Sequence, residues 1–538
     1  MIRSILFPKD TLKPCIASIW FVATAIGLAV ASGTAQGQTL YAALSTELKI
    51  LDPVYTTASI TRNHGFMIYD QLFGIDLDGQ PRPQMVETHT VRDDGLVHSF
   101  TLRDGLRFHD GQPVRATDVI ASIRRWGERD STGKLLLRVT EKLEAVAPNA
   151  FRIKLSEPFG MLRFALGKPS GSALFIMPER VANTPASEPI TDMTGSGPFI
   201  FKRDEWRQGY KVVYEKNRHY IPRDEPADGL AGGKVVKVDR VEWVTIPDPN
   251  ITVAALANGE VDFVESPSVD LIPVLERSPN VELYVINVRG QSGWLRPNHL
   301  AEPFDHPAAR QALLYIIDQE EILRALGIPK EDAWPHCASY FICPLPVRHE
   351  HGAHLGFTPD LNKARALLEE AGYNGGPVNI LQPTDILTTS QASLVIVHQL
   401  RKAGINARAV PMDWGTLVAR RAKKPSEDSE PWHLFPTIAT SLDAGNPLTN
   451  FYISTPCPNS IPGWPCDEKL ESLRQEWIRI TDPARKHLLE EHITSRARLV
   501  VPYVNWGQWQ ARTAYNKVLK GVQPSLVPVF WNIEKKES

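Results

Sequence analysis

The chain has 538 residues, of which 59 are Lys or Arg and 61 are Asp or Glu, so its formal net charge is only −2. The basic residues are spread along the sequence without a basic stripe or an aromatic-interleaved basic patch, which excludes nucleic acid as an expected partner. A chain of this length exceeds what one hydrophobic core can organise, so we expect at least two lobes.

The N-terminal 37 residues have the pattern of a secretory signal peptide. Basic residues precede an uncharged apolar run from Ile16 to Val30, and the small residues Ala31–Gly37 follow it. The run is shorter than the roughly 20 residues that a membrane-spanning helix needs. We therefore expect cleavage after Ala35 or Gly37 and export to the periplasm, and no later apolar run approaches spanning length.

Strand and turn signals occupy residues 98–111. The alternation of apolar and polar residues over His98–Leu102 predicts a half-buried strand, and Asp104-Gly105 predicts a tight turn. Leu106 to Phe108 are predicted to form a short return strand, and Asp110-Gly111 to turn the chain again. A helix follows, with Thr117 as its predicted cap and with Val119, Ile123 and Trp126 on one face at helical spacing.

Alternating helix and strand signals continue further along the chain. A helix over Thr252–Asn258, closed by Gly259, precedes a strand over Val261–Val264. Asp305 is predicted to cap a helix that runs to about Leu326.

The remaining elements are predicted in the same way. Asp360 starts a helix that ends at Gly372, and a helix over 390–403 precedes a strand over 406–410. Leu499–Trp506 is predicted to be a buried strand.

Four cysteines follow the signal peptide, as two close pairs. Cys337 lies near Cys343, and Cys457 lies near Cys466, which predicts two disulfides in an oxidising compartment. A zinc site is the weaker alternative, because neither pair has the two-to-four-residue spacer of a thiolate site.

Motifs for catalysis and for metal binding are missing from the sequence. It contains no Gly-x-Ser-x-Gly, phosphate loop or dinucleotide fingerprint, and residues 195–199 (Gly-Ser-Gly-Pro-Phe) have the wrong spacing for a serine elbow. His349, Glu350, His351 and His354 lack the spacing of a zinc motif, and we predict a solvated loop there. We expect no enzyme activity, no cofactor and no bound metal.

Three blocks of sequence resemble one family. Residues 102–119, 259–262 (Gly-Glu-Val-Asp) and 303–313 (Pro-Phe-Asp to Arg-Gln-Ala-Leu) are similar to motifs of the bacterial extracellular solute-binding proteins of family 5, the peptide- and nickel-type binding proteins of ABC transporters. The resemblance implies an α/β, two-lobe periplasmic-binding-protein fold of type II, cluster C-like, with an extra subdomain in lobe one and a hinge between the lobes.

The expected domain boundaries follow from this resemblance. Residues 38–288 would form lobe one, with an inserted subdomain at about 58–193. Residues 289–497 would form lobe two, and the segment 498–538 would return to lobe one.

The resemblance also implies ligand contacts. Asp443 falls at the position that pairs with the ligand's α-amino group in peptide-binding relatives, although Thr440 and Asn446 depart from the pattern where an aromatic residue and a second acid would stand. The alternative for Asp443 is a loop turn or helix cap. The other residues expected at the ligand are Thr46, Trp414, Asn446, Trp506, Gln508 and Trp509.

The function implied is that of a periplasmic component of an ABC importer. It would capture a peptide or peptide-like solute in an interlobe cleft and deliver it, as a monomer, to a membrane permease served by an ATPase subunit. Alternatives are the same fold with a nickel chelate, haem, opine or oligosaccharide as ligand, and, in another class, a secreted hydrolase or a ligand sensor.

Overall fold

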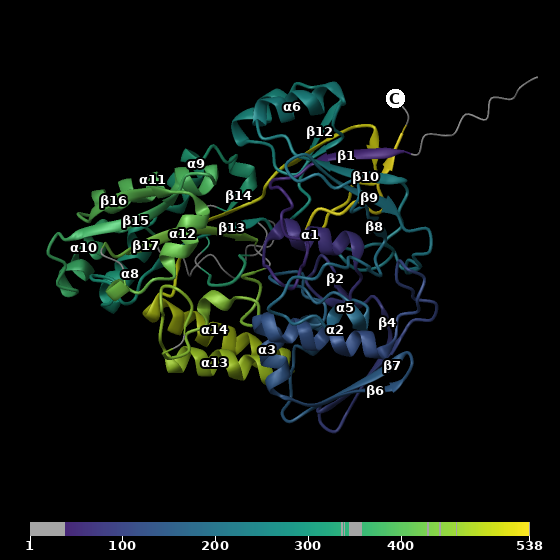
Figure 1. Ribbon diagram of the computed structural model, residues 1–538. Coiled ribbons are helices and arrows are strands. Elements are labelled where there is room, and N and C mark those ends of the chain that lie inside the picture. The colour runs from purple at the N-terminus through teal and green to yellow at the C-terminus, as the bar shows by residue number, and fades with distance from the viewer. Residues whose placement is uncertain are drawn as a thin grey trace, which may run out of the picture. The chain divides into compact units, whose positions relative to one another are not determined.

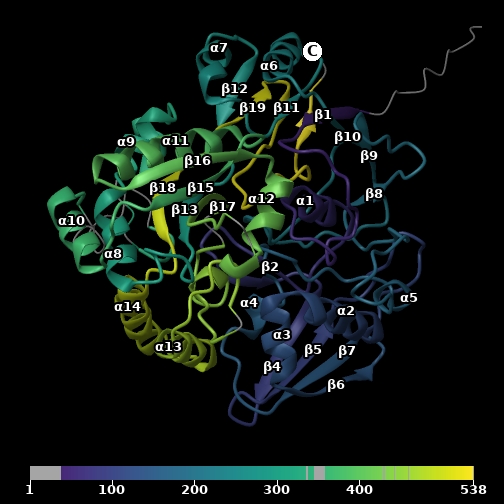
Figure 2. The ribbon, with the colours of Figure 1, turned by 60° about the vertical axis from the view of Figure 1, so that its left-hand side comes forward.

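Two large sheets organise the computed structural model, which describes residues 38–334, 337, 339–343, 358–427, 430–440, 443–458 and 460–536. The signal peptide and the histidine cluster at 349–354 predicted from the sequence lie outside these residues. Figures 1 and 2 show each sheet with its own helices. We call the part built on the seven-stranded sheet lobe one and the part built on the six-stranded sheet lobe two.

The seven-stranded sheet of lobe one has the order β12-β19-β11-β1-β10-β9-β8. Strand β1 pairs in parallel with both β10 and β11, whereas β19, from the C-terminal end of the chain, pairs antiparallel with β11 and β12. The strands are β1 (Thr39–Ala43), β8 (Phe199–Phe201), β9 (Lys211–Lys216), β10 (Arg240–Val244), β11 (Phe263–Val264), β12 (Val281–Tyr284) and β19 (Thr513–Asn516). Its helices include α1 (Ser59–Ile68), α6 (Pro249–Asn258) and α7 (Ile272–Glu276).

Helix α6 shows how local sequence fixes an element. The Asp248 carboxylate accepts hydrogen bonds from the backbone N–H groups of Asn250 and Ile251, and Gly259 ends the helix in the left-handed conformation at φ 77°. The helix predicted from Thr252 is confirmed, and it begins three residues earlier at Pro249. The predicted strand after it is confirmed only at Phe263–Val264.

A four-stranded antiparallel sheet, in the order β4-β5-β7-β6, also belongs to lobe one. Its strands are β4 (Val86–Arg92), β5 (Val97–Leu102), β6 (Thr140–Ala147) and β7 (Ala150–Leu155), and the helices α2 (Ala116–Arg129) and α3 (Ser131–Arg138) follow β5. Strand β5 confirms the strand predicted over 98–102. Val119, Ile123 and Trp126 of α2 are buried together, as their spacing predicts.

Two details of this segment differ from the prediction. Residues 106–108 form no strand, because only an isolated bridge joins Arg107 to Pro113. Thr117 lies inside helix α2 rather than at its cap. The helix is preceded by Arg115, whose backbone N–H donates to the Asp118 carboxylate at 2.7 Å, so an acid of the first turn does the capping.

The six-stranded sheet of lobe two has the order β14-β18-β13-β17-β15-β16. Its strands are β13 (Gln291–Pro297), β14 (Ala333–Trp334), β15 (Pro377–Pro383), β16 (Asn406–Met412), β17 (Leu434–Thr440) and β18 (Val504–Trp509). The helices are α8 (Pro307–Ile316), α9 (Gln319–Ala325), α10 (Leu361–Glu370), α11 (Leu387–Lys402), α12 (Trp414–Arg421), α13 (Glu468–Arg479) and α14 (Pro483–Val500). The helices and the strand predicted between 360 and 410 are confirmed as α10, α11 and β16.

Two predictions in lobe two were wrong. The single helix expected from Asp305 to about Leu326 is two helices, α8 and α9, because the chain is extended at Ile317 and the Asp318 carboxylate then caps α9 at Glu321 N–H. Leu499 and Val500, expected in a strand, form the end of helix α14, and the strand begins at Val504.

Two segments connect the lobes. The first joins β12 to β13 and the second joins β18 to β19, so the chain returns to lobe one at Thr513 and not from residue 498. Arg289 of the first segment donates to the Leu77 carbonyl at 2.9 Å. Arg512 of the second segment contacts Glu276 of lobe one at 3.2 Å and Asp332 of lobe two at 2.6 Å. Arg289 therefore holds the first segment to lobe one, and Arg512 holds the second segment to both lobes.

Away from these connections, the lobes also contact each other. One hydrophobic cluster combines residues of the four-stranded sheet, such as Phe100, with Trp294 of β13 and Trp477 of α13. The Gly160 N–H donates to the Ile478 carbonyl at 3.0 Å. The structure therefore describes the two lobes in contact.

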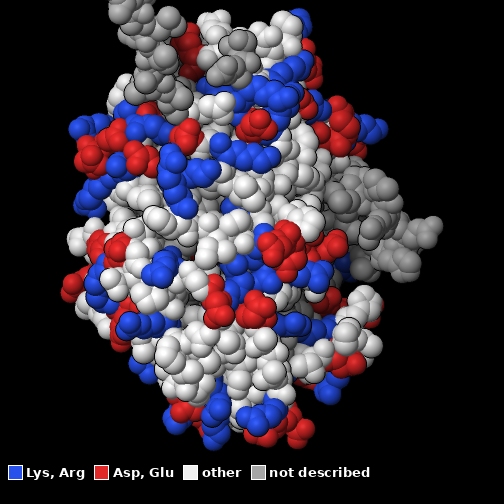
Figure 3. Space-filling view, turned by 90° about the vertical axis from the view of Figure 1, so that its right-hand side faces the viewer, with Lys and Arg blue, Asp and Glu red and all other residues white. Residues whose placement is uncertain are grey.

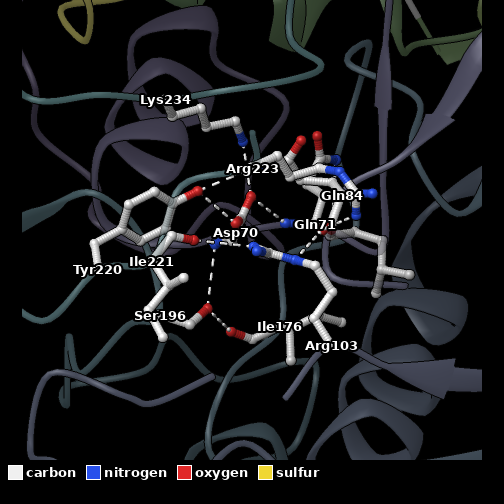
Figure 4. Close-up of polar contacts among 11 residues, drawn as sticks. Asp70, Gln71, Gln84, Arg103, Ile176, Ser196, Tyr220, Ile221, Arg223 and Lys234 are labelled. Atoms are coloured by element: carbon white, nitrogen blue, oxygen red, sulfur yellow. Dashed lines mark hydrogen bonds and ion pairs between the residues drawn. The ribbon is translucent and has the colours of Figure 1, made fainter. Parts of the chain in front are cut away.

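A buried polar network holds several loops of lobe one together (Figure 4). The Asp70 carboxylate accepts from Lys234 at 2.7 Å, from the Tyr220 hydroxyl at 2.8 Å and from the Gln71 N–H at 3.0 Å. Asp70 and Lys234 are each only 1% exposed. Because every partner comes from the protein itself, we interpret this network as structural.

The two predicted disulfides are confirmed, as Cys337–Cys343 and Cys457–Cys466, which rules out the zinc alternative for these four residues. On the face shown in Figure 3, acidic and basic side chains are interspersed, as the near-zero net charge suggests. No helix in the described part of the chain has the length and apolar character needed to cross a membrane.

Candidate ligand-binding site

Asp443 lies in the turn that follows strand β17. Its backbone N–H donates to the Thr440 carbonyl at 2.9 Å, and its Oδ2 accepts from the Thr440 hydroxyl at 2.9 Å and from the Thr440 N–H at 3.2 Å. Its other oxygen, Oδ1, receives no hydrogen bond from any described residue. Burial raises the pKa of this carboxyl group, while the charge of Arg62 and the Thr440 hydrogen bonds lower it. One carboxylate oxygen is thus fixed by the turn and the other remains available.

Arg62 of helix α1 is a buried cation from the other lobe. Its side chain is 6% exposed, and its Nε is buried without a hydrogen-bond partner among the described residues. Burial lowers the pKa of its guanidinium, and the charges of Asp443 and Glu265 raise it. Glu265 is held by Ser45, whose N–H and hydroxyl donate to it at 2.8 and 2.6 Å. Arg62 therefore faces two acids electrostatically without forming an ion pair with either.

Arg296 of strand β13 is a second buried cation without a carboxylate partner. It is 2% exposed, and both Nε and Nη2 are buried without a hydrogen bond within the described part of the chain. Its guanidinium lies over the rings of Tyr452, at 4.6 Å, and Phe435, at 5.4 Å. Burial, opposed by Tyr452 and assisted by the charge of Arg421, lowers the pKa of Arg296 to about 10.

Arg421, at the end of helix α12, completes this group. Its guanidinium lies 5.1 Å from the Phe435 ring centre and 5.3 Å from that of Trp414. Burial lowers its pKa, and Tyr452 is the group that opposes this effect. The Tyr452 hydroxyl in turn interacts with the charges of Arg296, Arg421 and Asp443.

We call Arg62, Arg296, Arg421, Asp443 and Tyr452 the arginine–aspartate cluster. Three cations and one acid with a free oxygen meet here, and they come from both lobes. Such a set can bind anionic groups through charge-assisted hydrogen bonds and an ammonium group through the carboxylate.

The structure places two of the sequence-predicted contacts beside this cluster. Asp443 belongs to the cluster, and the Trp414 ring lies against the Arg421 guanidinium. Asn446 lies three residues after Asp443, but its Oδ1 accepts from the N–H groups of Leu448 and Thr449 at 2.9 and 3.0 Å. The side-chain oxygen of Asn446 therefore stabilises its own turn.

Trp506 and Trp509, expected at the ligand, lie in the core of lobe two. Both are almost fully buried, and their rings stack at 5.2 Å within the cluster that covers the six-stranded sheet. The reason is a register shift between Gly293 and Trp294, opposite Trp506, which turns two side chains three positions apart to the same side of the strand.

Gln508 is hydrogen-bonded within the protein, and Thr46 is exposed. The Gln508 side chain accepts from the Cys343 N–H at 3.1 Å and donates to the carbonyls of Cys343 and Arg289 at 3.3 and 3.4 Å. It therefore ties a disulfide loop to the first connecting segment. Thr46 is exposed, in the loop where its neighbour Ser45 holds Glu265.

Four residues of the cluster were not predicted from the sequence: Arg62, Arg296, Arg421 and Tyr452. Arg296 had a usable signal, because a charged residue stands in the strand Gln291–Pro297, where six of seven residues are buried. Arg62 had none, since an arginine in a short helix is most often exposed. The described residues contain no group of three or more His, Cys, Asp or Glu side chains that could hold a metal ion.

Comparison with known proteins decides the family. The model of the bacterial extracellular solute-binding proteins, family 5, matches residues 80–458. The chain belongs to this family. Among its relatives, the probable peptide ABC transporter periplasmic-binding protein y4tO of Sinorhizobium fredii is 39% identical over 490 residues, which cover 91% of this chain and 92% of that protein.

Other family 5 proteins are more distant. The glutathione-binding protein GsiB of Salmonella typhi is 27% identical over 419 residues, covering 76% of this chain and 77% of that protein. Two solved structures share the fold at a TM-score of 0.76. AgaA from A. tumefaciens R10, in complex with agropinic acid, is 24% identical and covers 93% of this chain and 99% of its own. DppA from Helicobacter pylori, in complex with a peptide, is 20% identical and covers 93% and 98%.

Proposed function

We propose that this family 5 protein is the periplasmic substrate-binding component of an ABC importer and that it captures a peptide or peptide-like solute between its lobes. Membership of a solute-binding family and the name of the y4tO relative support this function. The protein performs no chemistry itself. It presents the bound solute to a membrane permease, and a separate ATPase subunit supplies the energy.

In this proposal the two connecting segments form the hinge. Residues 38–288 act as lobe one, with the inserted subdomain at about 58–193, residues 289–509 act as lobe two, and the C-terminal segment from Thr513 belongs to lobe one again. A hinge of a few residues in each segment allows the lobes to open for the solute and to close around it. Arg512, which contacts both Glu276 of lobe one and Asp332 of lobe two, stabilises the arrangement in which the lobes touch.

The observation that carries the proposal is the pair formed by Asp443 and Arg62. They come from different lobes, they act on each other electrostatically, and they form no ion pair. A solute with an ammonium group for Asp443 and an anionic group for Arg62 satisfies both, and a peptide carries both groups.

The proposed location of the protein is the periplasm. We propose that residues 1–37 are a cleaved signal peptide and that the mature chain is a periplasmic monomer. The two disulfides fit this compartment, because disulfides form and persist in oxidising environments.

Thermal unfolding of the mature chain tests the function. A peptide pool at saturating concentration is expected to raise the midpoint, since a ligand at 100 times its Kd adds about 2.7 kcal/mol to the free energy of unfolding. Parallel arms with nickel–histidine, an opine and an oligosaccharide test the alternative ligands. A shift with one of these arms and none with peptides would contradict the peptide proposal.

A further inference from the structure

The arginine–aspartate cluster holds more positive than negative charge. Glu265 is the other acid that acts on Arg62, and Ser45 already donates to it twice. Around Arg296 and Arg421 the interacting groups are aromatic rings and tyrosine hydroxyls, and no carboxylate of the described residues pairs with either guanidinium.

The excess of positive charge is significant because the arginines that carry it are buried. A guanidinium has five N–H donors and no acceptor, and leaving buried donors of a charged group without partners is costly. Arg62 leaves Nε unpaired, and Arg296 leaves Nε and Nη2 unpaired, at 6% and 2% exposure. The buried Arg125, by contrast, forms two hydrogen bonds with Asp52, at 3.2 and 2.7 Å.

The surroundings of Arg296 also favour an anionic partner. The Arg296 Cζ lies 5.4 Å from the Phe435 ring centre and 4.6 Å from that of Tyr452, and the Nε and Nη2 donors of Arg296 remain to bind a partner. The edge of a guanidinium matches the two oxygens of a carboxylate.

We propose that the solute is acidic: a peptide-like molecule with one ammonium group, bound by Asp443, and two carboxylates, one bound by Arg62 and one by Arg296 with Arg421 beside it. This inference rests on the proposed function and specifies the class of solute. The two arginine positions belong to different lobes, so a dianion of this kind also joins the lobes in the closed form.

Calorimetric titration with matched dipeptides tests the inference. Ala-Glu and γ-Glu-Ala carry two carboxylates and one ammonium group, whereas Ala-Gln and Ala-Ala carry one carboxylate. We expect the acidic peptides to bind about 10- to 100-fold more tightly, the effect of one charge-assisted pair. Equal affinity for acidic and neutral peptides would overturn the inference and leave the proposed function standing. Failure of every peptide, acidic and neutral, would contradict the proposed function itself.

Variants assign the carboxylates to the arginines. Arg296→Met is expected to reduce the preference for Ala-Glu over Ala-Gln to less than about threefold, and Arg62→Met to weaken Ala-Glu at least tenfold. Arg296→Gln provides a smaller change if the methionine variant does not fold. Arg124→Met, which removes an exposed arginine of helix α2, is the matched control and should keep the preference. An unchanged preference in both Arg296 variants and unchanged Ala-Glu affinity in Arg62→Met would overturn the assignment.

Discussion

At single positions, the polar groups that remain free are more informative than those that are bonded. The Asn446 side chain bonds within its own turn and the Gln508 side chain bonds to Cys343 and Arg289, whereas Asp443 keeps one free oxygen and Arg62 keeps its buried Nε unpaired. The family resemblance made Asn446, Gln508 and Asp443 candidates, and nothing in the sequence indicated Arg62. Only the hydrogen-bond partners separate a group that holds a loop from one that can hold a solute.

Asp443→Asn tests the amine contact at this scale. The amide keeps the size of the side chain and removes its charge, so affinity for peptides with a free amine is expected to fall about 10- to 100-fold. Affinity for N-acetylated peptides should stay nearly unchanged. Titration of both peptide forms into both proteins checks this, and an equal loss for the two forms would remove the proposed role.

The buried pair of Asp70 and Lys234 is expected to affect stability and not binding. Lys234→Met leaves a buried carboxylate without its cation, which typically costs about 3–5 kcal/mol of unfolding free energy. Urea denaturation measures the loss. The double variant Asp70→Asn/Lys234→Met should recover part of it, because no unpaired charge remains, and a single variant as stable as the wild type would contradict the role given to this pair.

His64 links stability to pH. Burial lowers its pKa from 6.5 to about 3, so below pH 6.5 the unfolded chain binds a proton that the folded chain does not. As far as His64 is concerned, the free energy of unfolding is highest above pH 6.5. It falls by about 1.4 kcal/mol per pH unit as the pH is lowered from 6.5 toward 3. Urea unfolding at pH 7 and at about pH 4.5 should show a pH-dependent loss that is about 2–3 kcal/mol smaller in His64→Gln. The same loss in both proteins would contradict this assignment.

At the scale of elements, local signals predicted most helices and missed where tertiary contacts intervene. Capping residues and terminal glycines located α6 and α10 within a few residues. The break between α8 and α9 was missed, because the apolar spacing continues through Ile316 and Ile317 although the chain bends at Asp318. The bulge that turns Trp506 depends on pairing with Gly293, more than 200 positions earlier, and no local pattern indicates it.

Gly293→Ala tests that packing. A Cβ at this position would lie 2.1 Å from the fully buried Trp506 ring, so the strand or the indole must move. We expect a loss of about 1–3 kcal/mol in unfolding free energy, the usual effect of overpacking. Gly376→Ala, whose Cβ would meet its nearest atom at 3.4 Å, is the control and should change stability little. Comparable stability of the two variants would show that the site has room.

At the scale of the whole molecule, the fold could be predicted from the sequence, but only part of the candidate site could. The blocks at 102–119, 259–262 and 303–313 were sufficient to predict a family 5 binding protein, and the two sheets and their connections agree with it. Asp443 was accessible by analogy with relatives. Arg62 and Arg296 were not, because Arg62 comes from the other lobe and Arg296 lies on a strand that pairs with β17 from more than 130 positions earlier in the sequence.

Hydrogen exchange of the mature chain, with and without a bound acidic dipeptide, tests the central claim most directly. If the solute binds between the lobes, peptide fragments from α1 in lobe one and from β17 through Tyr452 in lobe two should both become protected. Protection confined to one lobe, or located away from both segments, would contradict capture of the solute by the arginine–aspartate cluster.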